Sequence, residues 1–504
     1  MDDITRHKVS TEAECFIESI DPSTVCDLAS SYHPDKQRCW IFDEKKKGGF
    51  NVCFPVEFAS RQDGTTGERW MVRVPILPRL AFPEEKLRSE IATMKFIAEK
   101  TTIPIPRLIA YSLDNNNSLG TPFILLDFID GKPLFGIEFW KLPHTKMEQF
   151  FSKLGDIYIQ LSQHSFDRIG ALTLDSNENW ALAGLDPCRE IGPNQTFYST
   201  IDYVYTIHQA LFDDFYKGRD SIQSEGDARA YLFSLYDSRR FLMGWVKPEY
   251  NHGPFFLMHG DLRTANILVD NDLNIVSVLD WEWSHTIPAQ MFVPPPWLTG
   301  LELIGATKDY SRLLYESCVF TLQMETRRRE SEYYPKCRDI RELPLAKIWE
   351  TNLCGMNHFI ALGMLQPLYF GNIYWTVLQR DYYGIGRIHH KKRVDDFFSL
   401  EVHKPELEAV QKKLQQLSEF QKECDKLGIE VEWVAKTSGS KSLKEISESV
   451  ENSPSPRSYC PNMDTNHLVQ SLNNVPTPWK YVGATVLSVC CLMVLRKRWC
   501  FNSL

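Results

Sequence analysis

The feature that most constrains the fold of this chain is the segment 255–280, in which three short apolar runs alternate with polar loops. The runs 255–258, 267–269 and 275–279 predict buried strands. Turn-forming residues fill 270–272 and predict a tight hairpin between the last two strands. The polar residues that follow these strands are therefore expected to meet at one edge of a cleft.

Three polar residues follow the predicted strands: Asp261, Asn266 five positions later, and Asp280 after the hairpin. The protein-kinase catalytic loop, His-x-Asp-Leu-x-x-x-Asn, has this spacing, and a metal-binding aspartate follows a later strand. In the loop 258–266 Gly260 replaces the kinase arginine, and Asp280 is followed by Trp-Glu in place of Phe-Gly. No Ala-Pro-Glu motif comes after Asp280. These differences argue against a protein kinase.

The pattern resembles the aminoglycoside phosphotransferase family, which includes choline-kinase-like enzymes, and within it the fungal-type phosphotransferases. The resemblance implies an α+β, protein-kinase-like fold with a small antiparallel-sheet N-lobe and a larger, mainly helical C-lobe. It implies transfer of the γ-phosphate of ATP to a hydroxyl of a small molecule. Asp261 is then the catalytic base, Asn266 and Asp280 supply the oxygen ligands that Mg²⁺ prefers, and Arg263 is a candidate γ-phosphate contact.

Other residues near these candidates have structural interpretations. His259 is expected to hydrogen-bond to backbone near the loop, and Gly260 to permit a close turn. Trp281 and Trp283 are expected to be core aromatics rather than groups that stack on a substrate.

The residues upstream supply candidates for the ATP-binding half. Gly48 and Gly49 precede an apolar run and suit a loop that folds over phosphates, although an ordinary turn is also consistent with two glycines. Alternation along 70–75 puts Arg73 and Met71 on one face of a strand. Kinases carry a phosphate-binding lysine on this strand, and Arg73 is the basic residue here.

A helix is predicted over 86–100, with an apolar stripe formed by Leu87, Ile91 and Met94. Glu90 lies at the edge of this stripe. It is expected to pair with Arg73, although most helix glutamates face water.

The apolar run 123–129 predicts a buried strand that leads into a turn. This junction resembles the family's hinge, and the resemblance places adenine against the backbone of Asp127, Phe128 and Ile129.

The resemblance covers residues 36–395 and sets the domain organisation. The predicted parts are an N-terminal extension (1–35), the N-lobe (36–130), the C-lobe (131–400), a helical extension (401–434), a disordered linker rich in Ser, Asn and Pro (435–478) and a candidate membrane anchor (479–498).

The candidate anchor contains an uncharged run of 15 residues, 481–495, with the basic tripeptide 496–498 after it. Such a run makes about 22 Å of helix, less than the roughly 30 Å of a bilayer core. A short membrane anchor, a buried helix and an artefact of the gene model all stay open. An anchor would tie a cytoplasmic catalytic domain to an intracellular membrane.

Composition narrows the classes of partner. A net charge of −9 argues against nucleic acid. The 13 cysteines form no Cys-x-x-Cys pair, which argues against a zinc site and suits a reducing cytosol. The basic runs 45–47, 327–329 and 389–393 are expected to be solvated. The sequence gives no basis for an oligomeric state.

Two functions stay open: a small-molecule phosphotransferase, and a catalytically silent binding or regulatory module that keeps the kinase fold. Arg73 in place of lysine favours the second, since the two side chains are not interchangeable. The acceptor itself is not predicted, because its pocket would be built by second-lobe residues after 290 that carry no readable code.

Overall fold

The computed structural model describes residues 2–59, 67–175, 179–184, 195–333, 343–384 and 390–429. All of them belong to one unit, Met1–Gly439. The candidate anchor and the whole of the predicted linker lie outside these ranges. Within them, no helix combines the length and the apolar character needed to cross a membrane.

The N-terminal part is built on an antiparallel sheet, with the order β1-β3-β4-β6-β5 and with β2 paired to β3. Its strands are β1 (Cys39–Ile41), β2 (Lys46–Lys47), β3 (Asn51–Phe58), β4 (Arg69–Pro75), β5 (Leu108–Ser112) and β6 (Phe123–Asp127). The exposed β2 agrees with the solvated strand edge predicted for 45–47.

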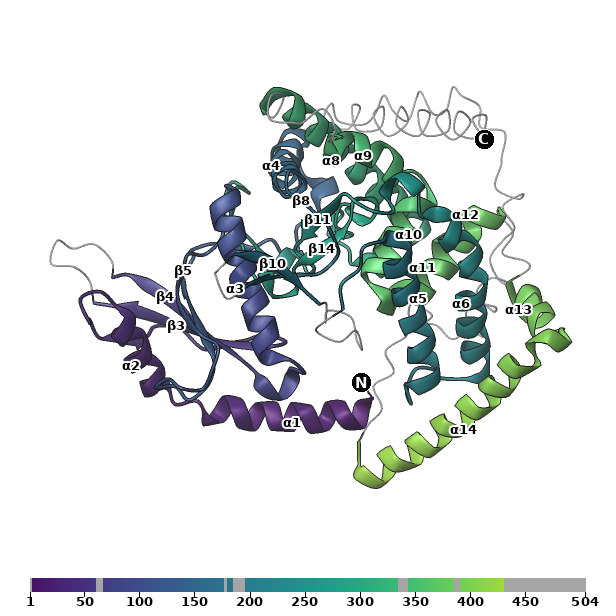
Figure 1. The fold of residues 1–504 in the computed structure, drawn as a ribbon, viewed down its shortest axis with the longest axis horizontal. Coiled ribbons are helices and arrows are strands. Elements are labelled where there is room, and N and C mark those ends of the chain that lie inside the picture. Colours follow the sequence, from purple (N-terminus) through teal and green to yellow (C-terminus); the bar gives the residue numbers. More distant parts are fainter. Residues whose placement is uncertain are drawn as a thin grey trace, which may run out of the picture. The chain divides into compact units, whose positions relative to one another are not determined.

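The two faces of this sheet bury different partners. Trp70, Val72 and Val74 of β4 join a core with α1 (Asp3–Ser19) and α2 (Pro22–Tyr32). Figure 1 shows both helices beside the sheet. Residues 1–35 therefore complete the core of the sheet. The alternation predicted for β4 is confirmed, and it leaves Arg73 on the opposite face.

That opposite face is covered by α3 (Pro83–Lys100). The predicted apolar stripe of Leu87, Ile91 and Met94 is buried. The helix begins three residues earlier than predicted because Pro83 occupies its first turn, where a proline loses no hydrogen bond.

The second lobe is mainly helical and shares one large apolar core with α3. Its longer helices are α4 (His144–Ser162), α5 (Thr200–Lys217), α6 (Glu225–Trp245), α8 (Asp309–Tyr333), α9 (Leu345–Asn352), α10 (Met356–Leu365), α13 (His390–Ser399) and α14 (Lys404–Leu427). Shorter ones are α7 (Leu303–Ala306), α11 (Phe370–Ile373) and α12 (Gln379–Tyr383).

The predicted strands of the opening segment are all present: β11 (Phe255–Met258), β12 (Ile267–Val269) and β13 (Ile275–Val278). β12 and β13 form the expected hairpin, and β7 (Lys132–Pro133) pairs with β12. β11 lies between β14 (His285–Pro288) and β8 (Ser165–Phe166). A separate hairpin joins β9 (Ala171–Leu174) and β10 (Trp180–Ala183).

Helices α4 and α8 pack closely, and two arginines of α8 contact α4. Arg328 Nη2 donates to Ser152 Oγ at 3.0 Å. Arg329 Nε lies 2.7 Å from Asp156 Oδ1. The prediction that the run 327–329 is solvated is therefore wrong for Arg329. The local sequence pattern around Arg329 could not indicate this ion pair, because Asp156 is 173 positions away in the chain.

The two ends of the described unit meet at Arg219. Its guanidinium lies 2.8 Å from Asp2, before α1, and 2.6 Å from Glu423 of α14. The helical extension predicted from residue 401 thus packs on the second lobe.

Two helix glycines test the α4–α8 contact. A Cβ at Gly155 would lie 2.7 Å from Thr326 Oγ1, whereas a Cβ at Gly244 meets nothing within 4 Å. Both alanine substitutions gain about 0.5–1 kcal/mol of backbone entropy. We expect Gly244→Ala to raise the Tm and Gly155→Ala to leave it unchanged or lower it, as measured by differential scanning fluorimetry. Equal gains in both variants would contradict the close packing.

Candidate active site

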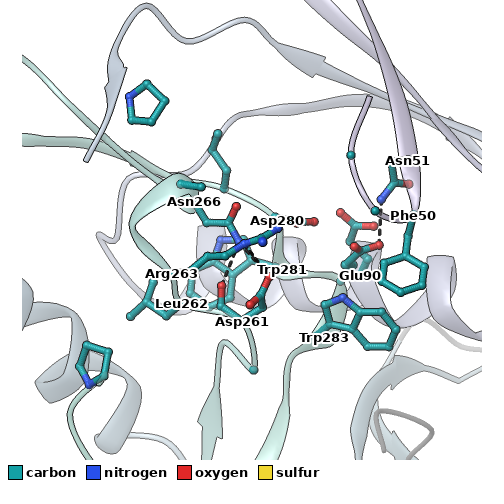
Figure 2. A pocket seen from close by; sticks show the side chains of 18 of the residues that line it. Phe50, Asn51, Glu90, Asp261, Leu262, Arg263, Asn266, Asp280, Trp281 and Trp283 are labelled. Atoms are coloured by element: carbon teal, nitrogen blue, oxygen red, sulfur yellow. Dashed lines mark hydrogen bonds and ion pairs between the residues drawn. The ribbon is translucent and has the colours of Figure 1, made fainter. Parts of the chain in front are cut away.

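One cavity of about 1310 Å³ contains every residue that the sequence assigned to a site. These residues are Gly48, Gly49, Arg73, Glu90, Asp127, Phe128, Ile129, Asp261, Arg263, Asn266 and Asp280. Figure 2 shows the catalytic-loop residues Asp261, Arg263 and Asn266 on one side of Asp280, with Glu90 and Asn51 on the other.

Gly260 fixes the path of the catalytic loop. Its φ is +78°, and a Cβ there would lie 2.0 Å from the carbonyl oxygen of Trp283. No side chain fits without moving that backbone. The prediction of a close turn is confirmed.

His259 holds the loop from behind. Its Nε2 donates to the carbonyl of Leu279 at 2.8 Å, and its ring packs on Trp281, 4.5 Å between centroids. Burial lowers the pKa of His259 to about 4, so the ring is neutral and Nδ1 can accept from the amide of Asp261 at 3.3 Å. The structural role predicted for His259 is confirmed.

Asp261 stands half-buried at the floor of the cavity. Asn266 Nδ2 donates to the Asp261 carbonyl at 2.9 Å and approaches its Oδ2 at 3.3 Å. Arg263 Nε lies 3.2 Å from the same Oδ2. Burial raises the pKa of Asp261 to about 6, against the opposing charge of Arg263. Asp261 is thus ionised at neutral pH with a proton affinity above that of an ordinary aspartate.

Arg73 pairs with Glu90, as predicted. It also reaches two acids of the second lobe: Nη2 is 2.5 Å from Asp280 Oδ1 and 3.3 Å from Glu282 Oε2. Burial alone would raise the pKa of Asp280, but the charge of Arg73 outweighs it and lowers the pKa. Burial raises the pKa of Glu90 to about 8.

Sequence reasoning missed Lys86, the second cation of this cluster. Lys86 Nζ lies 2.8 Å from Glu282 Oε2, and 4.1 Å and 3.6 Å from the ring centroids of Phe50 and Trp283. A usable signal existed, because Lys86 precedes Glu90 by four positions on one helix face. Three acids therefore share two cations, and the cluster carries a net negative charge when all are ionised.

Glu282 also joins the two lobes through Asn51, whose Nδ2 donates to its Oε2 at 2.9 Å (Figure 2). The tryptophans beside Glu282 differ. Trp281 is 1% exposed and is a core residue as predicted. The same prediction for Trp283 is wrong, because Trp283 is only half-buried and lines the cavity against Phe50.

The glycine loop is held from outside the cavity. Gly48 N donates to Asn51 O at 2.8 Å, and Arg79 Nη1 donates to Gly49 O at 2.7 Å. A Cβ at Gly49 meets nothing within 4 Å, so packing does not require glycine there. The loop lines the cavity while Arg79 constrains its backbone.

The predicted hinge also lines the cavity, but two of its amides are engaged. Asp127 N donates to Arg107 O at 3.1 Å, and Phe128 N donates to Arg69 O at 3.0 Å. A contact to adenine there would fall to the carbonyl oxygens of the segment or to the amide of Ile129.

Asp280 and Asn266 form the pair suited to a magnesium ion. The amide nitrogen of Asn266 is committed to Asp261, so Oδ1 is its available ligand atom. Across the described stretches, no group of three or more His, Cys, Asp or Glu side chains is arranged to hold a metal. Mg²⁺ needs only one or two protein ligands when a nucleotide supplies phosphate oxygens, so the pair fits.

Comparison with known proteins gives a family and a set of distant relatives. A sequence model of the phosphotransferase enzyme family matches residues 56–290. "Altered inheritance of mitochondria protein 9, mitochondrial" is 43% identical over 70 residues in Candida dubliniensis, covering 14% of this chain and 11% of that protein. In Yarrowia lipolytica it is 29% identical over 119 residues, covering 22% and 20%. The chain thus spans a small part of the relatives it matches.

Solved structures show the same kind of distant similarity. The GDP complex of wild-type aminoglycoside 2'-phosphotransferase-IIIa is 13% identical, with a TM-score of 0.38, covering 78% of this chain and 98% of that one. Macrolide 2'-phosphotransferase type I is 12% identical, with a TM-score of 0.36, covering 71% and 96%.

The ion pair between Lys86 and Glu282 can be tested by a double-mutant cycle. Lys86→Met leaves Arg73 as the cation that balances the charge of Glu282, and we expect a loss on the order of 3 kcal/mol, seen as a Tm lower by several degrees. Lys86→Met combined with Glu282→Gln should recover much of this loss, because the unpaired buried charge is gone. A double variant as unstable as the single one would contradict the pairing.

Proposed function

We propose that this chain is a phosphotransferase that uses ATP and Mg²⁺. The proposal starts from residues 56–290, which belong to the phosphotransferase enzyme family. The chain transfers the γ-phosphate to a hydroxyl of a small molecule. The new bond joins the acceptor oxygen to phosphorus, the bond to the β-phosphate oxygen breaks, and ADP leaves.

The observation that carries this proposal is the setting of Asp261. A carboxylate whose pKa is raised to about 6 suits a group that takes a proton from a hydroxyl near neutral pH. Asn266 and Arg263 both contact it, which orients Oδ2 in the cavity. Asp261 is therefore the proposed base.

The other residues neutralise and position the phosphates. Asp280 and Asn266 Oδ1 would hold Mg²⁺, which neutralises developing charge on the phosphates when bound. Arg73 and Lys86 offer positive charge near the glycine loop at 48–49. Arg263 is exposed enough to turn from Asp261 toward a γ-phosphate.

One contact favours the alternative, a catalytically silent module. Arg73 lies 2.5 Å from Asp280 Oδ1, so this ion pair would compete with a metal ion for the carboxylate. If the pair persisted with nucleotide present, one oxygen of Asp280 would be taken and Mg²⁺ binding would be weakened. The proposed function requires that Asp280 favour Mg²⁺ over Arg73 when Mg-ATP binds.

The location of this protein in the cell is also a proposal. The relatives' names assign those proteins to mitochondria, whereas the sequence predicts a cytoplasmic catalytic domain. We adopt the mitochondrial location for this chain as the proposal to be tested by fractionation, since it comes from matched sequence.

Nucleotide binding and turnover separate the two functions. With Mg-ATP we expect ADP release, and stabilisation by about 2.7 kcal/mol at a concentration 100 times Kd. Asp261→Asn should lower kcat by about 10²–10⁴-fold with stabilisation retained, because the base acts after binding. Asp280→Asn should lose the Mg²⁺-dependent part of both. The readouts are coupled ADP detection and thermal shift.

Asp272→Asn is the matched control, an exposed hairpin aspartate outside the cavity that should behave as wild type. Equal ADP release by wild type, Asp261→Asn and Asp280→Asn would end the enzymatic assignment. Stabilisation without turnover would favour the silent module.

The raised pKa of Asp261 predicts opposite effects of pH on activity and stability. As pH falls through about 6 the base is protonated, so kcat/KM should drop about tenfold per pH unit below it. The folded state binds this proton more tightly than the unfolded state, whose pKa is near 3.8. The stability that the proton gives is therefore lost as pH rises from 3.8 through 6. Asp261→Asn should have a higher Tm than wild type at pH 8 and an equal one at pH 4. A difference independent of pH would contradict this assignment.

A further inference from the structure

The end of the cavity beyond Asp261 differs in chemistry from the nucleotide end. We define the acceptor wall as the cavity-lining residues of 294–302 and 362–369. It consists of prolines 294–296 and 367, Trp297, Leu362, Leu365, Leu368 and Tyr369, with Glu302 and Gln366 as its polar members. Within this described wall Glu302 is the one charged side chain, and it is exposed to solvent.

The wall begins beside the proposed base. Trp297 Nε1 donates a hydrogen bond to the carbonyl of Leu262, the residue after Asp261. The Trp297 side chain is 3% exposed and packs on Phe139. This hydrogen bond therefore ties the wall to the loop that carries Asp261.

The wall is also pre-formed. Tyr315 OH donates to the carbonyl of Pro295 at 3.2 Å and lies 3.1 Å from His358 Nε2. Trp349 Nε1 donates to the carbonyl of Phe292 at 2.7 Å, just before the proline run. Side chains of α8 and α9 thus fix the backbone at Pro295 and Phe292, so binding need not order this part of the acceptor wall.

The size of the cavity leaves room for a second ligand. About 1310 Å³ exceeds the ~300–1,000 Å³ typical of one small-molecule site. The glycine loop, Arg73 and the hinge account for the nucleotide end. The volume along the acceptor wall is then the space for the acceptor.

The charge of the wall selects among alcohols. A polycation that packed along this wall would need several carboxylates to replace its hydration, and the described wall itself offers one, the exposed Glu302. Proline, leucine and aromatic surfaces gain free energy when they cover apolar groups.

We propose that the acceptor is a neutral alcohol with an apolar or aromatic body, which packs on the acceptor wall while its hydroxyl faces Asp261. The binding of such an alcohol is inferred from the residues of the acceptor wall alone. Phosphorylation of its hydroxyl rests on the proposed function.

The test uses the full chain with Mg²⁺, a non-hydrolysable ATP analogue and calorimetric titration of butyl, hexyl and octyl glucoside below their micelle concentrations. Each pair of added methylenes that the wall buries should tighten binding by about tenfold. The polycation kanamycin should bind more weakly than octyl glucoside. A series with equal affinities, or tighter binding of kanamycin, would overturn the inference.

A matched pair of variants locates the binding surface. Leu368 lies on the wall and is 37% exposed, so Leu368→Asp is compatible with folding, and we expect it to weaken octyl glucoside binding by about tenfold. Leu400, 54% exposed and outside the cavity, gives the control Leu400→Asp, which should bind as wild type. Equal affinities in the two variants would overturn the assignment.

Turnover with ATP separates this inference from the proposed function. Binding that tightens with alkyl chain length but gives no ADP release would support the acceptor wall and contradict the phosphotransferase function. ADP release that kanamycin stimulates and no glucoside stimulates would support the phosphotransferase function and contradict the acceptor wall.

Discussion

The arrangement of the site depends on one cation that three acids share. Arg73 of β4 contacts Glu90 of α3, and it contacts Asp280 and Glu282, which follow β13 in the other lobe. Removal of such a cation would leave buried charges uncompensated, which is more costly than the pair itself is stabilising. A magnesium nucleotide would bring a cation for Asp280 and anions for Arg73, and so would replace the contacts that it breaks.

The sequence predicted the parts of this site that local rules determine. Hydrophobic runs gave β11, β12 and β13, and period-two alternation gave the inward face of Arg73. Glu282 and Asn51 could not be paired in advance, because 231 positions separate them and neither lies in a pattern that names a partner. Trp283 was misassigned since a single turn after a strand has no periodicity from which burial can be read. The acceptor wall could not be predicted either, because its segments 294–302 and 362–369 have no periodicity that shows which side chains line a cavity.

The cooperative unit is wider than the segment that carries the motifs. The family match begins at residue 56, within β3. Val25 and Leu28 of α2 nevertheless belong to the same buried cluster as Val72 of β4, the strand that holds Arg73. At the other end, Arg219 joins the residues before α1 to α14. A motif therefore marks the chemistry, while apolar burial sets the boundary of what folds together.

Asp261 bears most directly on the choice between an enzyme and a silent module. Its burial raises its pKa to about 6, and the ionised form costs stability at neutral pH. An asparagine at this position would keep an oxygen for the amide of Asn266 without that cost. A base that must take a proton from an alcohol requires this charge, whereas a module that only binds ligands needs no proton acceptor here. Under the proposed function, the position that weakens the fold is the one that phosphoryl transfer needs, as expected where activity and stability make opposite demands on one side chain.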